Sequence, residues 1–254
     1  MYKNKTLRAW QAGEQTVGGW FSLNNVHVAE AMSSMGFSWL CLDLQHGLIE
    51  DSDMKHMLPA LSTGSATPFV RVSWNNPHQI MRALDAGAFG VIVPMINSAE
   101  DARNAVASCR YPPDGIRSFG PLRAGLVGGR DYPLQANKEI ACIGMIETAE
   151  GIKNLDEIVN TPGLDGIYIG PSDLALAIGL PAIGDNDNPE HQAVVEKIRV
   201  ATRNAGIAIG IHTSSAQFCK KYLDQGFQFV NLGTDFGFLA RAAREDLKFV
   251  KEYL

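Results

Sequence analysis

A carboxylate, an amide and an imidazole occur within four residues at the end of one apolar run. The run W-L-C-L (39–42) is typical of a buried strand, and Asp43, Gln45 and His46 follow it. A buried strand needs none of these groups, whereas a histidine, with an ordinary pKa of about 6.5, exchanges protons near neutral pH. Two interpretations are open here: a solvated strand end, or an acid–base site that contains His46.

Two further carboxylates, Glu147 and Asp173, also follow apolar runs, in G-M-I-E-T and G-P-S-D. Taken singly, Glu147 can be explained by a salt bridge to an arginine, and Asp173 by an N-cap, which is the favoured explanation for it alone. Taken together, they can bind one hard cation such as Mg²⁺ or Mn²⁺, with water and substrate completing the coordination. A zinc site would use closely spaced His or Cys residues, and none occurs here.

The turn G-P-S-D (170–173) and one arginine are candidates for holding an anion. The turn runs into a helix start, where free backbone N–H groups bind carboxylates or phosphates. Arg71 is a fixed cation in the apolar run P-F-V-R-V, and it can pair with Asp43 or Glu147 and still hold an oxyanion. A metal, an anion pocket, an arginine and a histidine are the parts needed to form the enolate of a 2-oxo acid.

The positions of the lysines argue against imine chemistry. The lysines fall in predicted helices, in terminal segments or before the apolar run 141–148, and none ends a predicted strand, where a Schiff-base aldolase needs it. We therefore expect neither a Schiff-base lysine nor PLP, and a metal in their place. No G-x-G-x-x-G motif follows a strand, so we also expect no nucleotide cofactor.

Short apolar runs alternate with helix-like segments along the whole chain and must position these groups. Segments 26–35 and 77–86 show helical periodicity, and N-N-P marks the start of the second. Continuous apolar strands between helices indicate a parallel sheet covered on both faces, and eight such units in 254 residues predict a single-domain (β/α)₈ TIM barrel. The predicted strands are 17–22, 39–44, 68–72, 90–94, 141–148, 166–170, 208–212 and 229–234.

Polar residues gather at the carboxyl ends of these strands, whereas their amino ends begin with almost only apolar residues. Catalytic groups of (β/α)₈ barrels lie at the carboxyl ends. We therefore predict a single active site at this rim, and we expect His212, at the end of strand 208–212, to contact substrate there.

Composition excludes several classes of function. The net charge is −5 and the pI about 5.7, so no basic field exists to hold nucleic acid or a membrane surface. The four cysteines are scattered and form no C-x-x-C pair, so we expect neither a disulfide framework nor a zinc site, as in proteins of reducing compartments. The first residues lack the apolar segment of a signal peptide, and no apolar run is long enough to span a membrane. We expect a soluble cytoplasmic protein.

One segment, 111–133, does not fit the repeating pattern. It is rich in Gly and Pro, is too long for an ordinary connection, and carries Arg117, Arg123 and Arg130. Loops of this length are usually functional or mobile, although a solvated excursion is the simpler explanation. We interpret residues 112–133 as a long active-site loop.

The chain resembles the HpcH/HpaI aldolase family over nearly its whole length. The motifs that carry the resemblance are D-L-Q-H-G (43–47), P-F-V-R-V (68–72), A-L-D-A-G-A-F-G-V-I-V-P (83–94), M-I-E-T-A-E-G-I-K-N-L-D-E-I (145–158) and G-L-D-G-I-Y-I-G-P-S-D-L-A (163–175). Members of this family are class II pyruvate aldolases that depend on a divalent metal such as Mg²⁺, Mn²⁺ or Co²⁺. The resemblance implies a (β/α)₈ barrel and a homo-hexamer, a trimer of dimers in which the C-terminal helix is exchanged between subunits.

The resemblance also implies a role for individual residues. Glu147 and Asp173 match the metal ligands, Arg71 the arginine that stabilises the enolate, and His46 the acid–base histidine. Asp85 matches a carboxylate that reaches this histidine from a neighbouring subunit. The matches to substrate-binding positions are Trp20 at the pocket floor, Gly170, Pro171 and Ser172 at the carboxylate cradle, and Arg117 and Arg123 in a loop on the aldehyde side.

Two positions depart from the family pattern. Many members carry Glu before the histidine, where this chain has Gln45, and many carry Gln two residues before the metal-binding Glu, where it has Met145. The metal ligands and the histidine are retained, so we expect lyase chemistry to be retained. The departures put the identity of the aldehyde and the proton relay in question, and we count Gln45 among the substrate contacts.

The expected reaction is the reversible cleavage of a 4-hydroxy-2-oxo acid to pyruvate or hydroxypyruvate plus an aldehyde, through an enolate stabilised by the metal. One alternative is an oxaloacetate decarboxylase that traps the same enolate in another bond-forming step. A second alternative, from another class, is a non-catalytic barrel that binds 2-oxo acids. The intact set of His46, Arg71, Glu147 and Asp173 argues against the second alternative.

Overall fold

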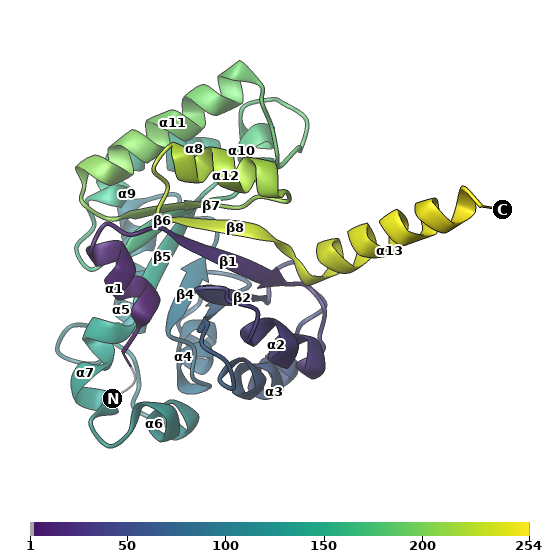
Figure 1. Cartoon of the computed structure of the whole chain (residues 1–254). Coiled ribbons are helices and arrows are strands. Elements are labelled where there is room, and N and C mark those ends of the chain that lie inside the picture. Colours follow the sequence, from purple (N-terminus) through teal and green to yellow (C-terminus); the bar gives the residue numbers. More distant parts are fainter. Residues whose placement is uncertain (1–2, 254) are drawn as a thin grey trace.

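Eight parallel strands close into a barrel in the computed structural model of the chain, which describes residues 3–253. The strands follow one another around the barrel in sequence order, and β8 pairs with β1 (Figure 1). The predicted (β/α)₈ barrel is confirmed, with every strand found within two residues of its expected bounds. The strands are β1 (Thr16–Phe21), β2 (Trp39–Asp43), β3 (Thr67–Arg71), β4 (Gly90–Val93), β5 (Ala141–Ile146), β6 (Gly166–Ile169), β7 (Ala208–Ile211) and β8 (Phe229–Thr234).

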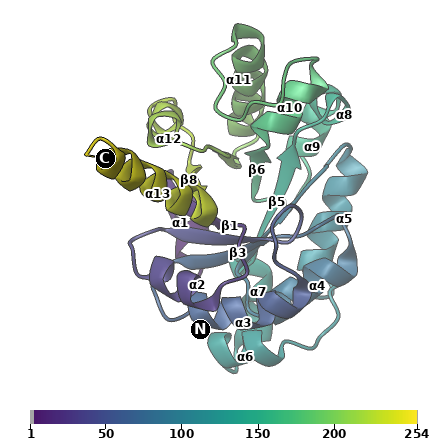
Figure 2. The same ribbon diagram turned by 90° about the vertical axis from the view of Figure 1, so that its right-hand side faces the viewer.

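Helices connect the strands and cover the outside of the barrel (Figures 1 and 2). The two helices expected at 26–35 and 77–86 are confirmed as α2 and α4. The helices are α1 (Lys5–Gln11), α2 (Val26–Ser33), α3 (Asp51–Leu61), α4 (Pro77–Asp85), α5 (Ala99–Cys109), α6 (Leu122–Gly128), α7 (Tyr132–Glu139), α8 (Ala149–Lys153), α9 (Leu155–Val159), α10 (Pro171–Ala177), α11 (Pro189–Asn204), α12 (Ala216–Asp224) and α13 (Asp235–Lys251). None of the helices in residues 3–253 has the length and apolarity required to cross a bilayer.

The apolar residues form two separate cores because strand side chains alternate between the two faces of the sheet. The outer core lies between the barrel and the helices and contains, for example, Leu40, Leu42 and Ile146. The inner core fills the barrel and includes the large rings of Trp39 and Phe69. The inner core ends below the carboxyl ends of the strands, where polar side chains replace apolar ones on the same inward face.

Helix α1 closes the amino end of the barrel. Its Trp10 stacks on Phe229, with ring centroids 4.2 Å apart, and also contacts Phe69 at 5.7 Å. Because Trp10 and Leu7 belong to the inner core, the barrel is filled from this side. The sequence patterns had not indicated this helix.

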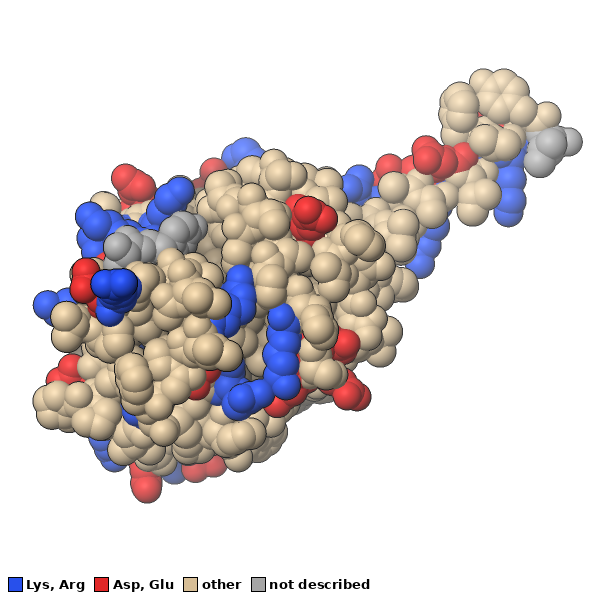
Figure 3. All heavy atoms as spheres, turned by 90° about the horizontal axis from the view of Figure 1, so that it is seen from below, with Lys and Arg blue, Asp and Glu red and all other residues tan. Residues whose placement is uncertain are grey.

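Helix α13 projects away from the barrel (Figures 1 and 2), and Figure 3 shows acidic and basic side chains along it. Among its seventeen residues only Asp235 is buried. Asp235 fixes the base of the helix, since its carboxylate accepts hydrogen bonds from the backbone N–H groups of Ser22 at 2.8 Å and Leu23 at 3.1 Å. The apolar side chains exposed along the rest of the helix are Phe236, Leu239, Leu247, Phe249 and Val250.

The segment predicted as one long loop at 112–133 is only partly irregular. It contains α6 and the start of α7. Both helices lie between the end of α5 and the start of β5, hence at the amino ends of the strands, away from the carboxyl rim of the same chain (Figure 1). Residues 112–133 thus include helical turns and lie away from the rim of their own chain, and their role as an active-site loop stays a prediction. The exposed apolar side chains of residues 116–134 are Ile116, Phe119, Leu122, Leu126 and Leu134.

Candidate active site

The inward-facing residues at the carboxyl ends of the strands form one polar layer above the inner core. Strand alternation places four of these residues two positions after an inner-core residue, on the same inward face: Asp43 after Cys41, Arg71 after Phe69, Glu147 after Met145 and Gly170 after Tyr168. The layer lies where (β/α)₈ barrels carry their active sites, as predicted. It contains Trp20 on β1, Asp43 on β2, Arg71 on β3, Glu147 after β5, Gly170 after β6 and His212 after β7.

Asp43 and Arg71 form a paired charge in this layer. They are direct partners in the β2–β3 register, and two guanidinium nitrogens bind the two carboxylate oxygens, Nε to Oδ1 at 2.9 Å and Nη2 to Oδ2 at 2.5 Å. Burial opposes ionisation of Asp43, but the hydrogen bonds and charge of Arg71 outweigh it and hold the pKa of Asp43 below its usual value. Arg71 is therefore a cation in a fixed orientation, and the sequence-based pairing with Asp43 is confirmed.

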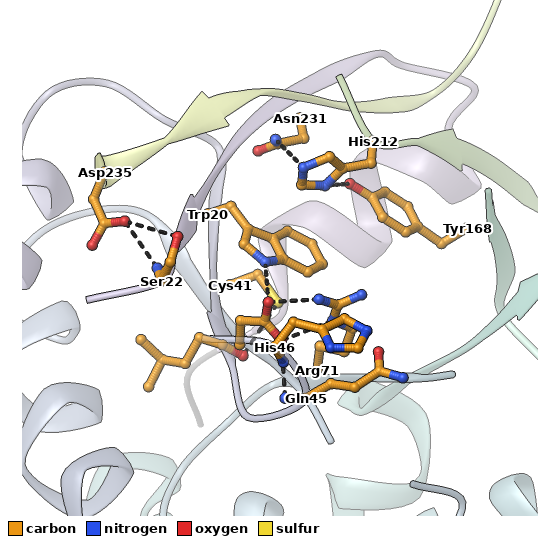
Figure 4. Close-up of polar contacts among 12 residues, drawn as sticks. Trp20, Ser22, Cys41, Gln45, His46, Arg71, Tyr168, His212, Asn231 and Asp235 are labelled. Atoms are coloured by element: carbon orange, nitrogen blue, oxygen red, sulfur yellow. Dashed lines mark hydrogen bonds and ion pairs between the residues drawn. The ribbon is translucent and has the colours of Figure 1, made fainter. Parts of the chain in front are cut away.

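Asp43 also organises the groups around it, a role that the sequence reasoning missed. Its Oδ2 accepts a hydrogen bond from Trp20 Nε1 at 3.1 Å, and its Oδ1 accepts from the backbone N–H groups of Gln45 at 3.0 Å and His46 at 3.2 Å. Figure 4 shows Gln45, His46 and Arg71 close to one another at this end of the barrel. One acidic side chain thus fixes the arginine, the aromatic floor and the turn that carries an exposed histidine.

Glu147 is buried at the end of β5 and makes no salt bridge within the described residues. Its Oε1 accepts a hydrogen bond from the backbone N–H of Met95 at 2.9 Å, and Met95 has a left-handed φ of 57°, which is uncommon for a residue other than glycine. Its Oε2 lies against Gly170, where an added Cβ would come within 2.3 Å of this oxygen. Burial and the nearby charge of Asp173 raise the pKa of Glu147 to about 7.

Asp173 lies in the first turn of α10 and is exposed. The N-cap of this helix is Gly170, and no side chain caps it, so the interpretation of Asp173 as the N-cap was wrong. The carboxylate is free to face Glu147 across the ends of β5 and β6. The first N–H groups of a helix have no intrahelical partner, and Pro171 has none to offer, which leaves those of Ser172 and Asp173 directed at the rim.

The pair of carboxylates fits a hard divalent cation. Two oxygen-donor side chains come together at the rim, and burial, with a smaller contribution from the charge of Asp173, raises the pKa of Glu147, which a bound cation would offset. No third His, Cys, Asp or Glu joins them into a cluster of potential ligands within residues 3–253. Such a donor set suits Mg²⁺ or Mn²⁺, which keep several water or substrate ligands, better than a structural zinc.

His212 is at the rim, as expected from the sequence, and is partly exposed. Its ring meets the edge of Trp20 with centroids 5.0 Å apart, and Trp20 in turn lies under the guanidinium of Arg71, 5.1 Å from the ring centroid. Burial, followed by the charge of Arg71, lowers the pKa of His212 to about 4. The imidazole is therefore neutral across the ordinary pH range.

Comparison with known proteins identifies the family to which the chain belongs. The HpcH/HpaI aldolase/citrate lyase family matches residues 16–242, which is most of the chain. The chain belongs to the HpcH/HpaI family. The resemblance inferred from the motifs is thereby confirmed.

Relatives of this HpcH/HpaI protein are aldolases. It is 38% identical to the hydroxypyruvate/pyruvate aldolase of Rhizorhabdus wittichii, over 95% of the chain and 96% of the relative. It is 39% identical to the 4-hydroxy-2-oxo-heptane-1,7-dioate aldolase of Salmonella dublin, over 95% and 92%. The crystal structure of an HpcH/HpaI aldolase/citrate lyase family protein from Burkholderia cenocepacia superposes with a TM-score of 0.91 at 33% identity, covering 98% of this chain and 99% of that one. The protein is a lyase of the aldolase type.

Three predicted site residues lie away from the rim of their own HpcH/HpaI barrel. Asp85 ends α4, and its carboxylate binds Arg117 Nη2 at 2.8 Å. Arg117 is fully buried, with its guanidinium 4.4 Å from the ring centroid of Tyr111. Arg123 donates to the carbonyl of Ala86 at 2.7 Å. Helix ends of this kind lead into the amino ends of strands, so Asp85, Arg117 and Arg123 do not contribute to the site of the same chain.

The two positions that depart from the family pattern lie close to the polar layer. The Oε1 atom of Gln45 is buried without a hydrogen-bond partner in the described chain. Met145 is part of the inner core, and its methyl group would lie 3.1 Å from a Cβ added at Gly170. Gln45 thus has an acceptor to offer at the rim, and Met145 forms an apolar support beneath the carboxylate site.

Proposed function

We propose that this HpcH/HpaI protein is a divalent-metal-dependent aldolase that reversibly cleaves 4-hydroxy-2-oxo acids to pyruvate or hydroxypyruvate plus an aldehyde. The observation that carries the proposal is the polar layer itself. It brings together a fixed guanidinium, Arg71, and a carboxylate with raised pKa, Glu147, beside a second carboxylate, Asp173. The names of the relatives support this substrate class, since they act on pyruvate, hydroxypyruvate or a 4-hydroxy-2-oxo acid.

Glu147 and Asp173 are the residues that would hold the cation, which we propose to be Mg²⁺ or Mn²⁺, with Co²⁺ as a further candidate. When bound, such a cation polarises the 2-oxo group and stabilises negative charge that develops on its oxygen. Gly170 leaves the space that Glu147 needs to point at the rim. The N–H of Met95 holds the other oxygen of the same carboxylate in place.

Arg71 would hold the oxygen of the 2-oxo group. Two of its nitrogens are occupied by Asp43, while its third, Nη1, makes no hydrogen bond within the described residues. A guanidinium fixed in this way is preorganised for the enolate, because it needs no reorientation as charge develops. Trp20 would form the floor beneath the substrate, and the backbone N–H groups of Ser172 and Asp173, in the turn Gly170–Asp173, would receive its carboxylate.

His46 would handle the proton of the 4-hydroxyl group, directly or through a water molecule. It is exposed, and the two backbone hydrogen bonds from its turn to Asp43 place it on the same side of the rim as Arg71. Removal of that proton breaks the bond between carbons 3 and 4, and the electron pair moves into the enolate beside Arg71. Gln45, whose amide oxygen is unpaired, would contact the substrate next to it.

We further propose that the active form is a homo-oligomer, a hexamer arranged as a trimer of dimers. The exposed apolar side chains of α13, and those of residues 116–134, support this proposal because residues 3–253 leave both groups uncovered. Exchange of α13 would form the dimer. Asp85, Arg117 and Arg123 would then act at the rim of a neighbouring subunit, not of their own. The four free, buried cysteines agree with a cytoplasmic location.

Metal depletion tests the proposed function. Treatment with EDTA should abolish the release of pyruvate from a 4-hydroxy-2-oxo acid, and added Mn²⁺ or Mg²⁺ should restore it. Glu147→Gln should lower the activity at least 100-fold, whereas Glu157→Gln, which changes an exposed carboxylate of α9, serves as the matched control. Full activity in EDTA would refute the metal role. Faster turnover of oxaloacetate alone than of any hydroxy-oxo acid would favour the decarboxylase alternative.

A further inference from the structure

Three polar side chains, carried by three successive strands or by the residue that directly follows, form a row inside the barrel. Tyr168 lies on β6, His212 directly after β7, and Asn231 on β8 (Figure 4). Tyr168 and Asn231 are completely buried, and His212 is the member that reaches the open end of the barrel. The reaction proposed above uses neither Tyr168 nor Asn231.

Hydrogen bonds within the row fix the protonation of the imidazole. Asn231 Nδ2 donates to the carbonyl of Thr213 at 2.9 Å, which determines the orientation of the amide. The same nitrogen faces His212 Nε2 at 3.5 Å, so Nε2 is an acceptor. The proton of the neutral ring is then on Nδ1, which faces the hydroxyl of Tyr168 at 3.3 Å.

Neither ionisable member of the row is suited to proton transfer near neutral pH. Burial lowers the pKa of His212 to about 4, and burial also raises the pKa of Tyr168 well above its usual value. General acids and bases work best when their pKa is close to the operating pH. The row is therefore a set of neutral hydrogen-bonding groups near pH 7, and not a second acid–base group.

The row has unused hydrogen-bonding capacity of both kinds. Asn231 Oδ1 is buried and has no partner in the described chain. Because Tyr168 accepts from His212 Nδ1, its own O–H is left as a donor. The two contacts of His212, at 3.3 and 3.5 Å, are long, so its ring nitrogens can be shared with another group. A ligand that can both donate and accept, and carries no charge, matches these properties.

The location of the row connects it to the substrate. His212 packs against Trp20, and Trp20 lies under Arg71, the group proposed to hold the 2-oxo oxygen. An additional carboxylate of the substrate would find no further cation at this position among residues 3–253, since Arg71 is paired with Asp43 and its remaining nitrogen is proposed to hold the 2-oxo oxygen. A hydroxyl group is uncharged, so it can form hydrogen bonds with the row and needs no cation beside it.

We infer that Tyr168, His212 and Asn231 form a subsite for an uncharged hydroxyl group of the substrate, with His212 as the contact and the other two as positioning residues. This inference rests on the proposed function for the identity of the substrate. The hydroxyl can belong to carbon 3 of the 2-oxo acid, as in hydroxypyruvate, or to carbon 2 of the aldehyde, as in glycolaldehyde. In the first case the subsite makes the enzyme prefer hydroxypyruvate to pyruvate, and in the second case glycolaldehyde to acetaldehyde.

Two pairs of substrates distinguish these sources. In the first, hydroxypyruvate and pyruvate are compared as donors with the same aldehyde, propanal. In the second, glycolaldehyde and acetaldehyde are compared as acceptors with pyruvate. The ratio of kcat/KM within each pair is measured for the wild type, for His212→Leu and for Tyr168→Phe, which retains the stacked ring and removes only the hydroxyl.

We expect both variants to lower the ratio of one pair about tenfold, the effect of one lost hydrogen bond. The pair that responds identifies the source of the hydroxyl. Tyr222→Phe removes the hydroxyl of a buried tyrosine outside the barrel, which bonds Gln192, and is the matched control. Unchanged ratios in both variants, or an equal change in the control, would overturn the inference.

Equilibrium binding separates this inference from the proposed function. The affinities of hydroxypyruvate and pyruvate, and of glycolaldehyde and acetaldehyde with pyruvate bound, are measured by calorimetry with Mn²⁺ present. A preference that depends on His212 and Tyr168 supports the subsite even if the wild type forms no carbon–carbon bond, an outcome that would refute the aldolase proposal alone. Equal affinities within both pairs for the wild type would refute the subsite and leave the aldolase proposal standing.

Discussion

Asp43 and Arg71 face each other across neighbouring strands, and both oxygens of the carboxylate are bound by the guanidinium. Pairing in register brings the two side chains to the same place on the inward face of the barrel, within reach of each other. The strand pairing therefore aims the arginine, and the same carboxylate holds Trp20 and the turn of His46. Catalytic geometry at this rim depends on one acidic residue that contacts no substrate in the proposed reaction.

Replacing Asp43→Asn should affect both activity and stability. The buried guanidinium of Arg71 loses its counter-charge and its aim, so we expect pyruvate release to fall about 100-fold and the free energy of unfolding to fall by about 3 kcal/mol. Kinetics and urea unfolding measure the two effects. Asp224→Asn breaks an exposed pair with Lys220 and should cost less than about 1 kcal/mol. Equal effects of the two substitutions would contradict the role of Asp43.

Gly170→Ala should weaken metal binding without changing any ligand. The new methyl group would come within 2.3 Å of Glu147 Oε2 and displace that carboxylate from the rim. We expect the affinity for Mn²⁺ to fall about 10- to 100-fold, as for other changes that misorient a ligand, and titration calorimetry measures it. Gly125→Ala, in exposed α6, meets no atom within 4 Å and is the control. Wild-type affinity in Gly170→Ala would show that Glu147 does not need this space.

The free energy of unfolding should depend on pH through the protonation of His212. Its pKa is about 4 in the folded protein and about 6.5 in the unfolded chain. Between these values the unfolded chain binds more protons, so the contribution of His212 is complete above pH 6.5 and is lost as pH falls toward 4. It amounts to at most about 3 kcal/mol.

Comparison with His212→Leu isolates this contribution, because the variant lacks the titrating group. The free energy of unfolding is measured in urea at pH 7.5 and at pH 4.5 for both proteins. The difference between the wild type and the variant should shrink at the lower pH. A difference that stays constant with pH would mean that the imidazole is not held neutral.

Charges placed on the apolar face of α13 should change the assembly. Leu239→Asp combined with Leu247→Asp puts two carboxylates among exposed apolar side chains that we propose to be covered in the dimer. Light scattering after size exclusion should show a smaller species than the wild type. Arg241→Asp combined with Arg244→Asp adds charge of the same sign elsewhere on the helix and is the control. An unchanged mass in the leucine variant would exclude α13 from the assembly.

The strands could be predicted from the sequence because parallel barrel strands are continuous apolar runs, and the residue that ends each run was also visible. Glu147, Arg71 and His46 stand out for this reason. Asn231 did not, because one amide inside the run F-V-N-L-G has no periodic signal, and Tyr168 reads as one more aromatic residue of the core. Met95 contributes only its backbone N–H, which no side-chain pattern can indicate.

Contacts between distant parts of the chain were the main gap. The pairing of Asp85 with Arg117 joins the end of α4 to a segment more than thirty residues later, and no local pattern fixes such an encounter. The same holds for α1, since Trp10 closes the barrel through contacts with Phe69 and Phe229. The spacing of residues predicts whether a segment is a helix or a strand, whereas tertiary packing determines at which end of the barrel the segment lies.

The base of α13 and the turn of the histidine meet at a single residue. Ser22 gives its N–H to Asp235 at the start of the helix, and its carbonyl accepts from Leu48, two residues beyond His46. The start of the projecting helix is thus hydrogen-bonded to the same residue as the turn that carries His46. We expect a change in the direction of α13 to reach the turn of His46 through the peptide of Ser22, so that contacts made by the helix influence the position of the imidazole.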